Sequence, residues 1–219
     1  MSNEPTSFLY PFIDGEERDE VGLLTDLSRS ASAKMEESRQ LGNLTIERSR
    51  PQLQQAGQEM AERLRLGGRL FAFGNGGSAT DAAGLVDLFL SPPYGIPLPA
   101  LALVDDRAVL TALANDVGYD LVFSRQIIAH GRPGDIAVGF STSGGSVNVL
   151  NAFDQASTGG LLTLGFAGYE GGSMASSSSV QHCLVVGSDS VHRIQEAQSA
   201  LVFELWSIVQ RGLGERGAQ

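Results

Sequence analysis

Two short stretches of this chain combine glycine with hydroxyl side chains in a way that suits the binding of an anion. The first, here called the glycine turn, is Gly74-Asn75-Gly76-Gly77-Ser78 and follows the apolar run 70–73. The second, the serine turn, is Ser141-Thr142-Ser143-Gly144-Gly145-Ser146 and follows the apolar run 136–140. Both precede a helical pattern, and the N–H groups and dipole at a helix N-terminus favour negative charge. A phosphate is the ligand that we expect.

The spacing within these turns excludes two familiar nucleotide motifs. The glycine turn is not a dinucleotide fingerprint, because Ala79 stands where the third glycine belongs, and it is not a Walker A loop, because no Gly-Lys-Ser/Thr follows. A glycine turn of this kind also occurs as a tight connection without a ligand. The serine turn is more specific, since its four hydroxyls in six residues exceed the one or two that turn chemistry needs.

The pattern around the turns predicts the elements that must position them. Nearly continuous apolar runs at 70–73, 100–104, 136–140, 161–165 and 182–186 are typical of strands buried on both faces. Helical patterns lie between and after them, at about 79–90, 106–114, 120–130, 146–157 and 191–212. This alternation predicts an α/β fold with a parallel sheet covered by helices on both faces.

The region before the first strand is expected to be helical. Apolar residues three and four apart predict an amphipathic helix from about Asp19 to Arg39. A second helix is expected to start at Pro51, a favoured first-turn residue, and to end at Gly67. We expect residues 1–50, with the apolar patch 8–13, to serve packing or oligomerisation, residues 51–213 to form the main domain, and 214–219 to be a flexible tail.

Composition narrows the function classes. The chain has 219 residues and a formal net charge of −10, which argues against nucleic-acid and anionic-membrane partners. Its single cysteine, Cys183, excludes an intrachain disulfide and a cysteine-rich metal site, and its place in an apolar run predicts a buried residue. No signal peptide and no long apolar span is evident, so a soluble, cytoplasmic protein is expected.

Four motifs together resemble a known family. They are the glycine turn, Ala-Asn-Asp at 114–116, the serine turn and Arg-Ile-Gln-Glu at 193–196, in this order. In this combination, over about residues 51–213, the chain is similar to SIS (sugar isomerase) domains of the phosphoheptose isomerase group, which act on sedoheptulose 7-phosphate. The resemblance implies a three-layer αβα sandwich with a five-stranded parallel sheet. It also implies a homo-oligomer, typically a tetramer, although a dimer stays open.

The resemblance further assigns residues to a sugar-phosphate site. It places the phosphate on Ser141, Thr142, Ser143 and Ser146, and the sugar chain along Asn75, Gly76, Gly77, Ser78, Asn115, Asp116 and Gln195. Without the resemblance, Asn115 and Asp116 before Gly118 read equally well as turn residues.

The catalytic half of the family pattern is substituted. The resemblance implies zinc held by His, Glu, Gln and His, and in this chain those positions are Gly84, Leu88, Gln195 and Phe203. Glycine, leucine and phenylalanine neither transfer protons nor bind zinc. Asp87 and Glu204 are each one residue away, but one helical step turns a side chain by about 100°. We therefore expect no metal and no cofactor.

His192 is the remaining candidate for acid–base work, because it precedes Gln195 by about one helical turn. Paired with Glu196 or Asp87 it could support proton transfer, whereas the alternative is a histidine that only hydrogen-bonds a loop. Two functions therefore stay open. One is a phosphosugar-binding protein, a sensor or a scaffold for an unidentified protein partner, with doubtful catalysis. The other is a metal-independent isomerase that converts sedoheptulose 7-phosphate to a heptose 7-phosphate through His192 or nearby carboxylates.

Overall fold

The computed structural model describes residues 20–214. The chain divides into two compact units, with the boundary in the sequence between Glu37 and Ser38. The described part of the first unit is helical and belongs to α1 (Glu20–Arg65). Val21, Leu24 and Met35 are exposed on it, so it carries unpartnered apolar side chains. The apolar patch 8–13 and residues 215–219 of the predicted tail lie outside the described residues, whereas Gly214, the first residue of that predicted tail, ends helix α7 (Val191–Gly214). The domain division near residue 50 stays a prediction.

The second unit is built on one sheet of five parallel strands in the order β2-β1-β3-β4-β5. The strands are β1 (Leu70–Gly74), β2 (Ala100–Ala102), β3 (Ile136–Ser141), β4 (Leu162–Gly168) and β5 (His182–Val186). Every residue of β1, β3 and β4 is buried. The continuous apolar runs of the sequence therefore did indicate strands covered on both faces, and the predicted α/β architecture is confirmed.

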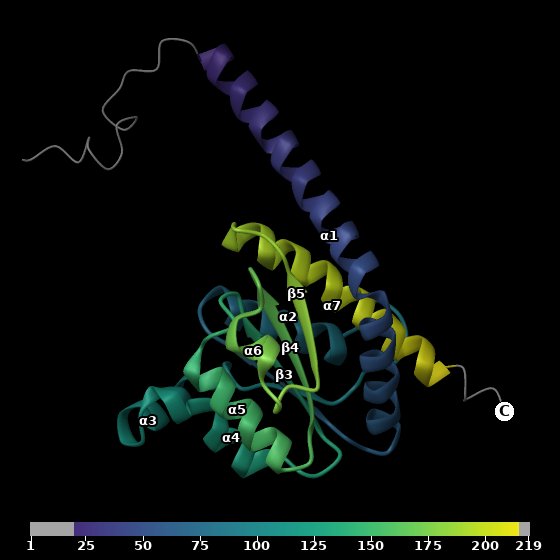
Figure 1. The fold of residues 1–219 in the computed structure, drawn as a ribbon, viewed down its shortest axis with the longest axis vertical. Helices are drawn as coiled ribbons and strands as arrows, with labels where there is room; N and C mark the ends of the chain where they lie inside the picture. Colours follow the sequence, from purple (N-terminus) through teal and green to yellow (C-terminus); the bar gives the residue numbers. More distant parts are fainter. Residues whose placement is uncertain (1–19, 215–219) are drawn as a thin grey trace, which may run out of the picture. The chain divides into compact units, whose positions relative to one another are not determined.

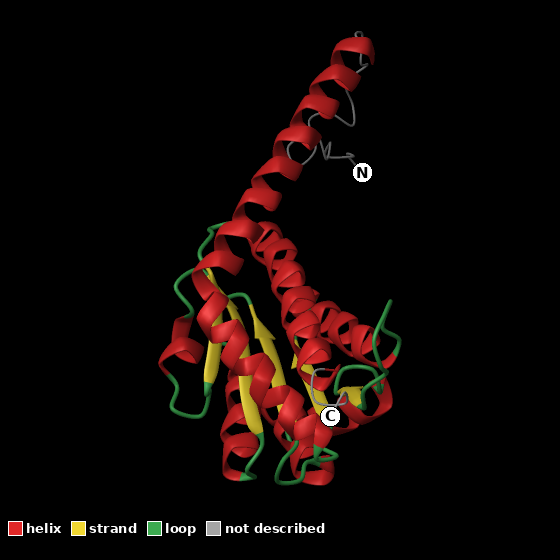
Figure 2. Cartoon of the chain, turned by 90° about the vertical axis from the view of Figure 1, so that its right-hand side faces the viewer, coloured by secondary structure: helices red, strands yellow, loops and turns green. Residues whose placement is uncertain are grey.

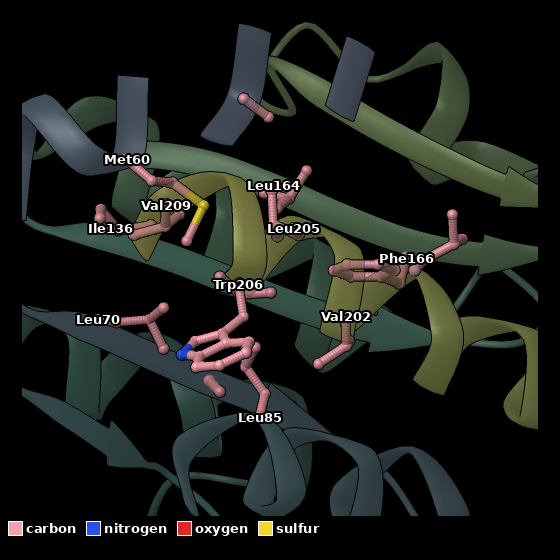
Figure 3. Close-up of a cluster of buried hydrophobic side chains, with 14 of the residues drawn as sticks. Met60, Leu70, Leu85, Ile136, Leu164, Phe166, Val202, Leu205, Trp206 and Val209 are labelled. Carbon is pink, nitrogen blue, oxygen red and sulfur yellow. The ribbon is translucent and has the colours of Figure 1, made fainter. Parts of the chain in front are cut away.

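Helices cover both faces of this sheet (Figures 1 and 2). They are α2 (Gly77–Leu90), α3 (Arg107–Asp116), the 3-10 helix η2 (Tyr119–Leu121), α4 (Val122–His130), α5 (Val147–Thr158), α6 (Gly172–Ser176) and α7 (Val191–Gly214). One core joins α1, α2 and α7 to the sheet, and the other joins α4, α5 and α6 to its opposite face. Trp206 of α7 is fully buried in the first core, close to Leu70 and Leu85 (Figure 3).

The predicted break between two N-terminal helices is wrong, because α1 runs without interruption through Pro51. A proline inside a helix lacks its own N–H donor and crowds the carbonyl four residues earlier. Here the proline is exposed, so water can satisfy the freed carbonyl, and Leu53 and Met60 beyond it anchor the helix in the core. Tertiary packing thus outweighs the local cost of the proline.

The strand order places a switch point between β1 and β3. These strands are neighbours in register, with Gly74 opposite Phe140. The chain leaves β1 into α2, which packs on one face, and leaves β3 into α5, which packs on the other. Ligands of open α/β sheets bind in the crevice that such divergence leaves at the carboxyl ends of the strands. Both glycine-containing turns lie there.

Candidate functional site

The serine turn folds its hydroxyls toward one another at the end of β3. Ser141 Oγ lies 2.9 Å from Ser146 Oγ and 3.4 Å from Ser143 Oγ, and the Gly145 N–H donates to Ser143 Oγ at 3.2 Å. Ser146 is the N-cap residue of α5, yet its side chain makes no capping hydrogen bond. The first turn of α5 therefore keeps donors that its N-cap side chain does not satisfy, beside a cluster of hydroxyls.

The back of the serine turn is fixed by the segment after β4. Gly168 N–H donates to the Thr142 carbonyl at 2.9 Å, and Met174 N–H donates to the Gly144 carbonyl at 2.8 Å. Gly144 has a φ of +63°, and a Cβ there would lie 2.0 Å from the carbonyl oxygen of Gly171. Only glycine fits this position. Two carbonyl oxygens of the turn, which would repel an anion, are thus engaged by the neighbouring segment.

A pair of asparagines connects the two turns. Asn75 Nδ2 donates to Asn148 Oδ1 at 2.8 Å, and Asn148 Nδ2 donates to Asn75 Oδ1 at 3.0 Å. The Tyr119 hydroxyl adds a donor to Asn75 Oδ1 at 2.9 Å. Asn148 is only 3% exposed. The reciprocal bonds hold the glycine turn against the start of α5, so the two turns lie side by side at the ends of β1 and β3.

Gln195 of α7 reaches the glycine turn from the other side. A Cβ on Gly77 would lie 2.2 Å from Gln195 Nε2, so the absence of a side chain at Gly77 lets the glutamine approach the backbone. The same Nε2 donates to Asp81 Oδ2 at 3.2 Å. Gln195 therefore contacts the glycine turn and, one helical turn into α2, a carboxylate.

Burial raises the pKa of Asp81 above its ordinary value, and the hydrogen bond from Gln195 offsets only part of this effect. The side chain is partly buried beside the turn. Asp81 is the carboxyl group that the structure adds to the predicted site. A carboxyl with a raised pKa in a cleft is a common feature of sites that bind or transfer protons.

Asp81 also lines a cavity of about 380 Å³ between α2 and α7. The lining residues are Thr80, Asp81, Gly84, Leu85, Leu88, Ser199, Val202 and Phe203. The three substituted positions of the family pattern thus lie on the wall of one cavity. The backbone brings them together, although their side chains carry no donor atom.

Zinc needs three or four nitrogen, sulfur or carboxylate ligands. Of the cavity's lining residues, only Asp81 supplies such a ligand. Among residues 20–214, no group of three or more His, Cys, Asp and Glu side chains is placed to hold a metal ion. The residues present do not fit the zinc that the resemblance implies.

The contacts that the structure gives for His192 and Glu196 do not involve Asp81. Glu196 accepts hydrogen bonds from Ser38 and Arg193. Both bonds lower the pKa of Glu196, the bond from Ser38 having the larger effect, and slight burial only partly opposes them. His192 is exposed and acts on Glu196 only through its charge. A carboxylate with a lowered pKa is a weak base, so this pair is less suited to proton abstraction than Asp81.

Asn115 and Asp116 end α3, are exposed and hydrogen-bond each other at 2.8 Å. Gly118, with a φ of +99°, then turns the chain into η2, whose Tyr119 reaches the glycine turn. Within residues 20–214 no side-chain hydrogen bond links Asn115 or Asp116 to either turn. Their contact with a sugar stays a prediction.

Sequence reasoning missed Asn148, Tyr119 and Asp81. Asn148 offered a signal, since it is a polar residue between Val147 and Val149 at the start of a helix. Asp81 is likewise the only charged residue in the first nine residues of α2. Tyr119 offered none, because its partner is 44 residues away in the sequence.

His182 and Cys183 are the first two residues of β5. His182 Nε2 lies 3.1 Å from Glu59 Oε2, an acidic partner that is distant in sequence. Burial, the largest single effect, acts to raise the pKa of Glu59, but hydrogen bonds from His182 and Gln55 together with the nearby charges of His182 and Arg63 lower it overall. Cys183 is half-buried rather than fully buried, and burial raises the pKa of its thiol to about 11. A raised pKa disfavours the thiolate, which is the nucleophilic form of cysteine.

Comparison with known protein families and with individual proteins gives the same family in each case. The model of the SIS domain family matches residues 35–168. A phosphoheptose isomerase of Roseiflexus sp. (strain RS-1) is 43% identical over 175 residues, which are 78% of this chain and 87% of that protein. Within residues 20–214, no helix is both long and apolar enough to cross a membrane.

Solved structures agree. A phosphoheptose isomerase from Francisella tularensis superposes with a TM-score of 0.77 at 30% identity, covering 84% of this chain and 97% of the other. One from Neisseria gonorrhoeae gives 0.75 at 33% identity, covering 84% and 99%.

Proposed function

The chain belongs to the SIS-domain family and is of its phosphoheptose isomerase type, and we propose that it binds a sugar phosphate resembling sedoheptulose 7-phosphate. In this proposal the phosphate occupies the serine turn. The carbon chain runs along the glycine turn toward Gln195, with Asn115 and Asp116 at its open side.

One observation carries the proposal. The Ser146 side chain leaves the N-terminus of α5 uncapped and joins Ser141 in a hydroxyl cluster instead. A helix start normally gains about 0.5–2 kcal/mol from a capping side chain. Forgoing that contact beside a group of hydroxyls favours a site in which an external anion accepts the free donors. The name of the relatives, phosphoheptose isomerase, supports a sugar phosphate as the source of that anion.

Isomerase activity is the second candidate function. Moving a carbonyl from C2 to C1 of a ketose through an enediol requires one group that takes a proton from carbon and another that serves the oxygens. Asp81 favours this function, since its carboxyl has a raised pKa and contacts Gln195. We place binding first, because the expected pair His192 and Glu196 lies on exposed surface with the glutamate ion-paired.

We keep a homo-oligomeric state and a cytoplasmic location as parts of the same proposal. The exposed apolar side chains of the first unit, such as Val21 and Leu24, support self-association or contact with a protein partner. Light scattering after size-exclusion chromatography measures the oligomeric state, and cell fractionation tests the cytoplasmic location.

The decisive test compares binding with turnover. Sedoheptulose 7-phosphate at 100 times its dissociation constant should stabilise the fold by about 2.7 kcal/mol in thermal unfolding, whereas unphosphorylated sedoheptulose should not. A turnover assay on the same protein, with and without zinc, separates the two functions. Turnover that disappears in Ser143→Ala would establish the isomerase. Equal stabilisation by both sugars would overturn the phosphate cradle.

A further inference from the structure

The cavity between α2 and α7 has a wall that is chemically unlike a metal site. Phe203, Leu88 and Val202 supply hydrocarbon, Gly84 supplies no side chain, and Thr80 and Ser199 supply neutral hydroxyls. Asp81 is the one ionisable residue among those lining it. A zinc ion here would have a single carboxylate and no imidazole or thiolate, which is too few ligands for a stable site.

We propose that the cavity between α2 and α7 binds no zinc in this chain and that Asp81, held by Gln195, is the group that recognises a ligand hydroxyl there. The second half of this proposal rests on the proposed function, and the first half does not. The ligand class is a polyhydroxylated chain whose phosphate lies in the serine turn.

The contacts of Gln195 connect the cavity to that turn. Its Nε2 donates to Asp81 and lies over Gly77, and Asn75 in the same turn is bonded to Asn148 at the start of α5. A ligand that leaves the serine turn along the glycine turn therefore meets Gln195 and then Asp81. The carboxylate has a further oxygen beyond Oδ2 with which to accept a hydrogen bond from a hydroxyl.

The backbone places positions 84, 88 and 203 around one cavity, although the side chains at these positions cannot bind a metal ion. Gly84 and Leu88 are one helical turn apart on α2 and share a face, and Phe203 faces them across the cavity from α7. A Cβ added at Gly84 would meet nothing within 4 Å. A side chain can therefore begin at position 84 without a clash. We expect that replacing the side chains at positions 84, 88 and 203 is enough to rebuild a metal site here.

The zinc half is tested with zinc alone. The wild-type protein and the variant Gly84→His/Leu88→Glu/Phe203→His are each dialysed against zinc and passed through a desalting column. Inductively coupled plasma mass spectrometry then measures the zinc bound per chain. We expect no stoichiometric zinc in the wild type and about one ion per chain in the triple variant. Gly84→Ala is the control for the altered helix.

Stoichiometric zinc in the wild type would overturn this half, since ligands would then come from elsewhere, such as a second copy. A folded triple variant without zinc would overturn the inference that only the side chains at positions 84, 88 and 203 separate this cavity from a zinc site. If the triple variant does not fold, Gly84→His/Phe203→His leaves Leu88 in place and answers the same question with two imidazoles.

The Asp81 half is tested by calorimetry with sedoheptulose 7-phosphate and with inorganic phosphate. Asp81→Asn should weaken the sugar phosphate about tenfold and leave inorganic phosphate unchanged, because one charged hydrogen bond is worth roughly 1.5 kcal/mol or more. Equal affinity of variant and wild type for the sugar phosphate would overturn it. A wild type that binds no sugar phosphate would overturn the proposed function together with the Asp81 half, while the zinc result would stand by itself.

Discussion

Asn75 and Asn148 pair their side-chain amides reciprocally, at 2.8 and 3.0 Å, and so join the two turns across the switch point between β1 and β3. Each amide satisfies the other, which is why Asn148 is stable at a buried position. The pair makes the glycine turn and the serine turn one mechanical unit. Its integrity should matter for both stability and binding.

Replacing Asn148 by leucine should therefore lower the free energy of unfolding by about 1–3 kcal/mol. The reason is that the Asn75 Nδ2 group loses its acceptor, while Tyr119 still donates to Asn75 Oδ1. Affinity for the sugar phosphate should fall with it. Denaturant unfolding and calorimetry measure the two effects. The control is Asn151→Ala, because Asn151 lies on α5 like Asn148 and donates one hydrogen bond, to the Asp120 carbonyl in η2. This variant should cost less stability. A stable, fully binding Asn148→Leu protein would show that the pair is dispensable.

Gly77→Ala should weaken sugar-phosphate binding at least tenfold, since the new methyl group would displace Gln195 from the glycine turn. Gly84→Ala lies on the same helix in open space. It should stabilise the helix by up to about 1 kcal/mol and leave Gln195 where it is, so it is a control for stability and not for binding. Unaltered affinity in Gly77→Ala would mean that Gln195 does not shape the site.

Gln198 is fully buried, and neither its amide nitrogen nor its amide oxygen has a hydrogen-bond partner among the described residues. Gln198→Met should raise the free energy of unfolding by roughly 1–3 kcal/mol, because it removes this desolvation cost at similar volume. Gln210 is the matched control on the same helix, since its amide bonds both backbone groups of Ile96. Gln210→Met should destabilise. Loss of stability in Gln198→Met would reveal a partner for this amide.

The raised pKa of Asp81 predicts that the free energy of unfolding depends on pH. Its pKa is raised by burial, so the folded state binds the proton more tightly than the unfolded chain. The stabilising contribution is complete below the ordinary value of 3.8 and is lost as the pH rises through the raised pKa. Asp81→Asn should therefore gain stability over the wild type as the pH increases from acid to neutral. Unfolding at several pH values measures this, with exposed Asp87→Asn as the control for net charge. A difference that shrinks with pH would contradict the assignment.

The sheet could be predicted from the sequence because its three central strands, β1, β3 and β4, are buried on both faces and form continuous apolar runs. The interruption of α1 was mispredicted at Pro51, since the same residue suits a first turn and can be tolerated inside a helix that the core anchors. Local pattern alone does not separate these cases.

The two turns were also readable, because glycine, serine and threonine after a strand have a local meaning. The residues that connect them were not. Asn75 and Asn148 are 73 residues apart, and Asp81 meets Gln195 across 114. Such pairs depend on strand order and helix placement, which place distant residues in contact only after folding.

The central claim, a phosphate cradle in the serine turn, is tested most directly by the calorimetric affinity of sedoheptulose 7-phosphate for the double variant Ser143→Ala/Ser146→Ala. Ser157→Ala, an exposed serine at the far end of the same helix, is the control. We predict that the double variant, still folded, binds at least about a hundredfold more weakly, since each lost hydrogen bond to a charged phosphate costs roughly 1.5–3 kcal/mol. We predict that Ser157→Ala matches the wild type. Equal affinity of the double variant and the wild type would contradict the account.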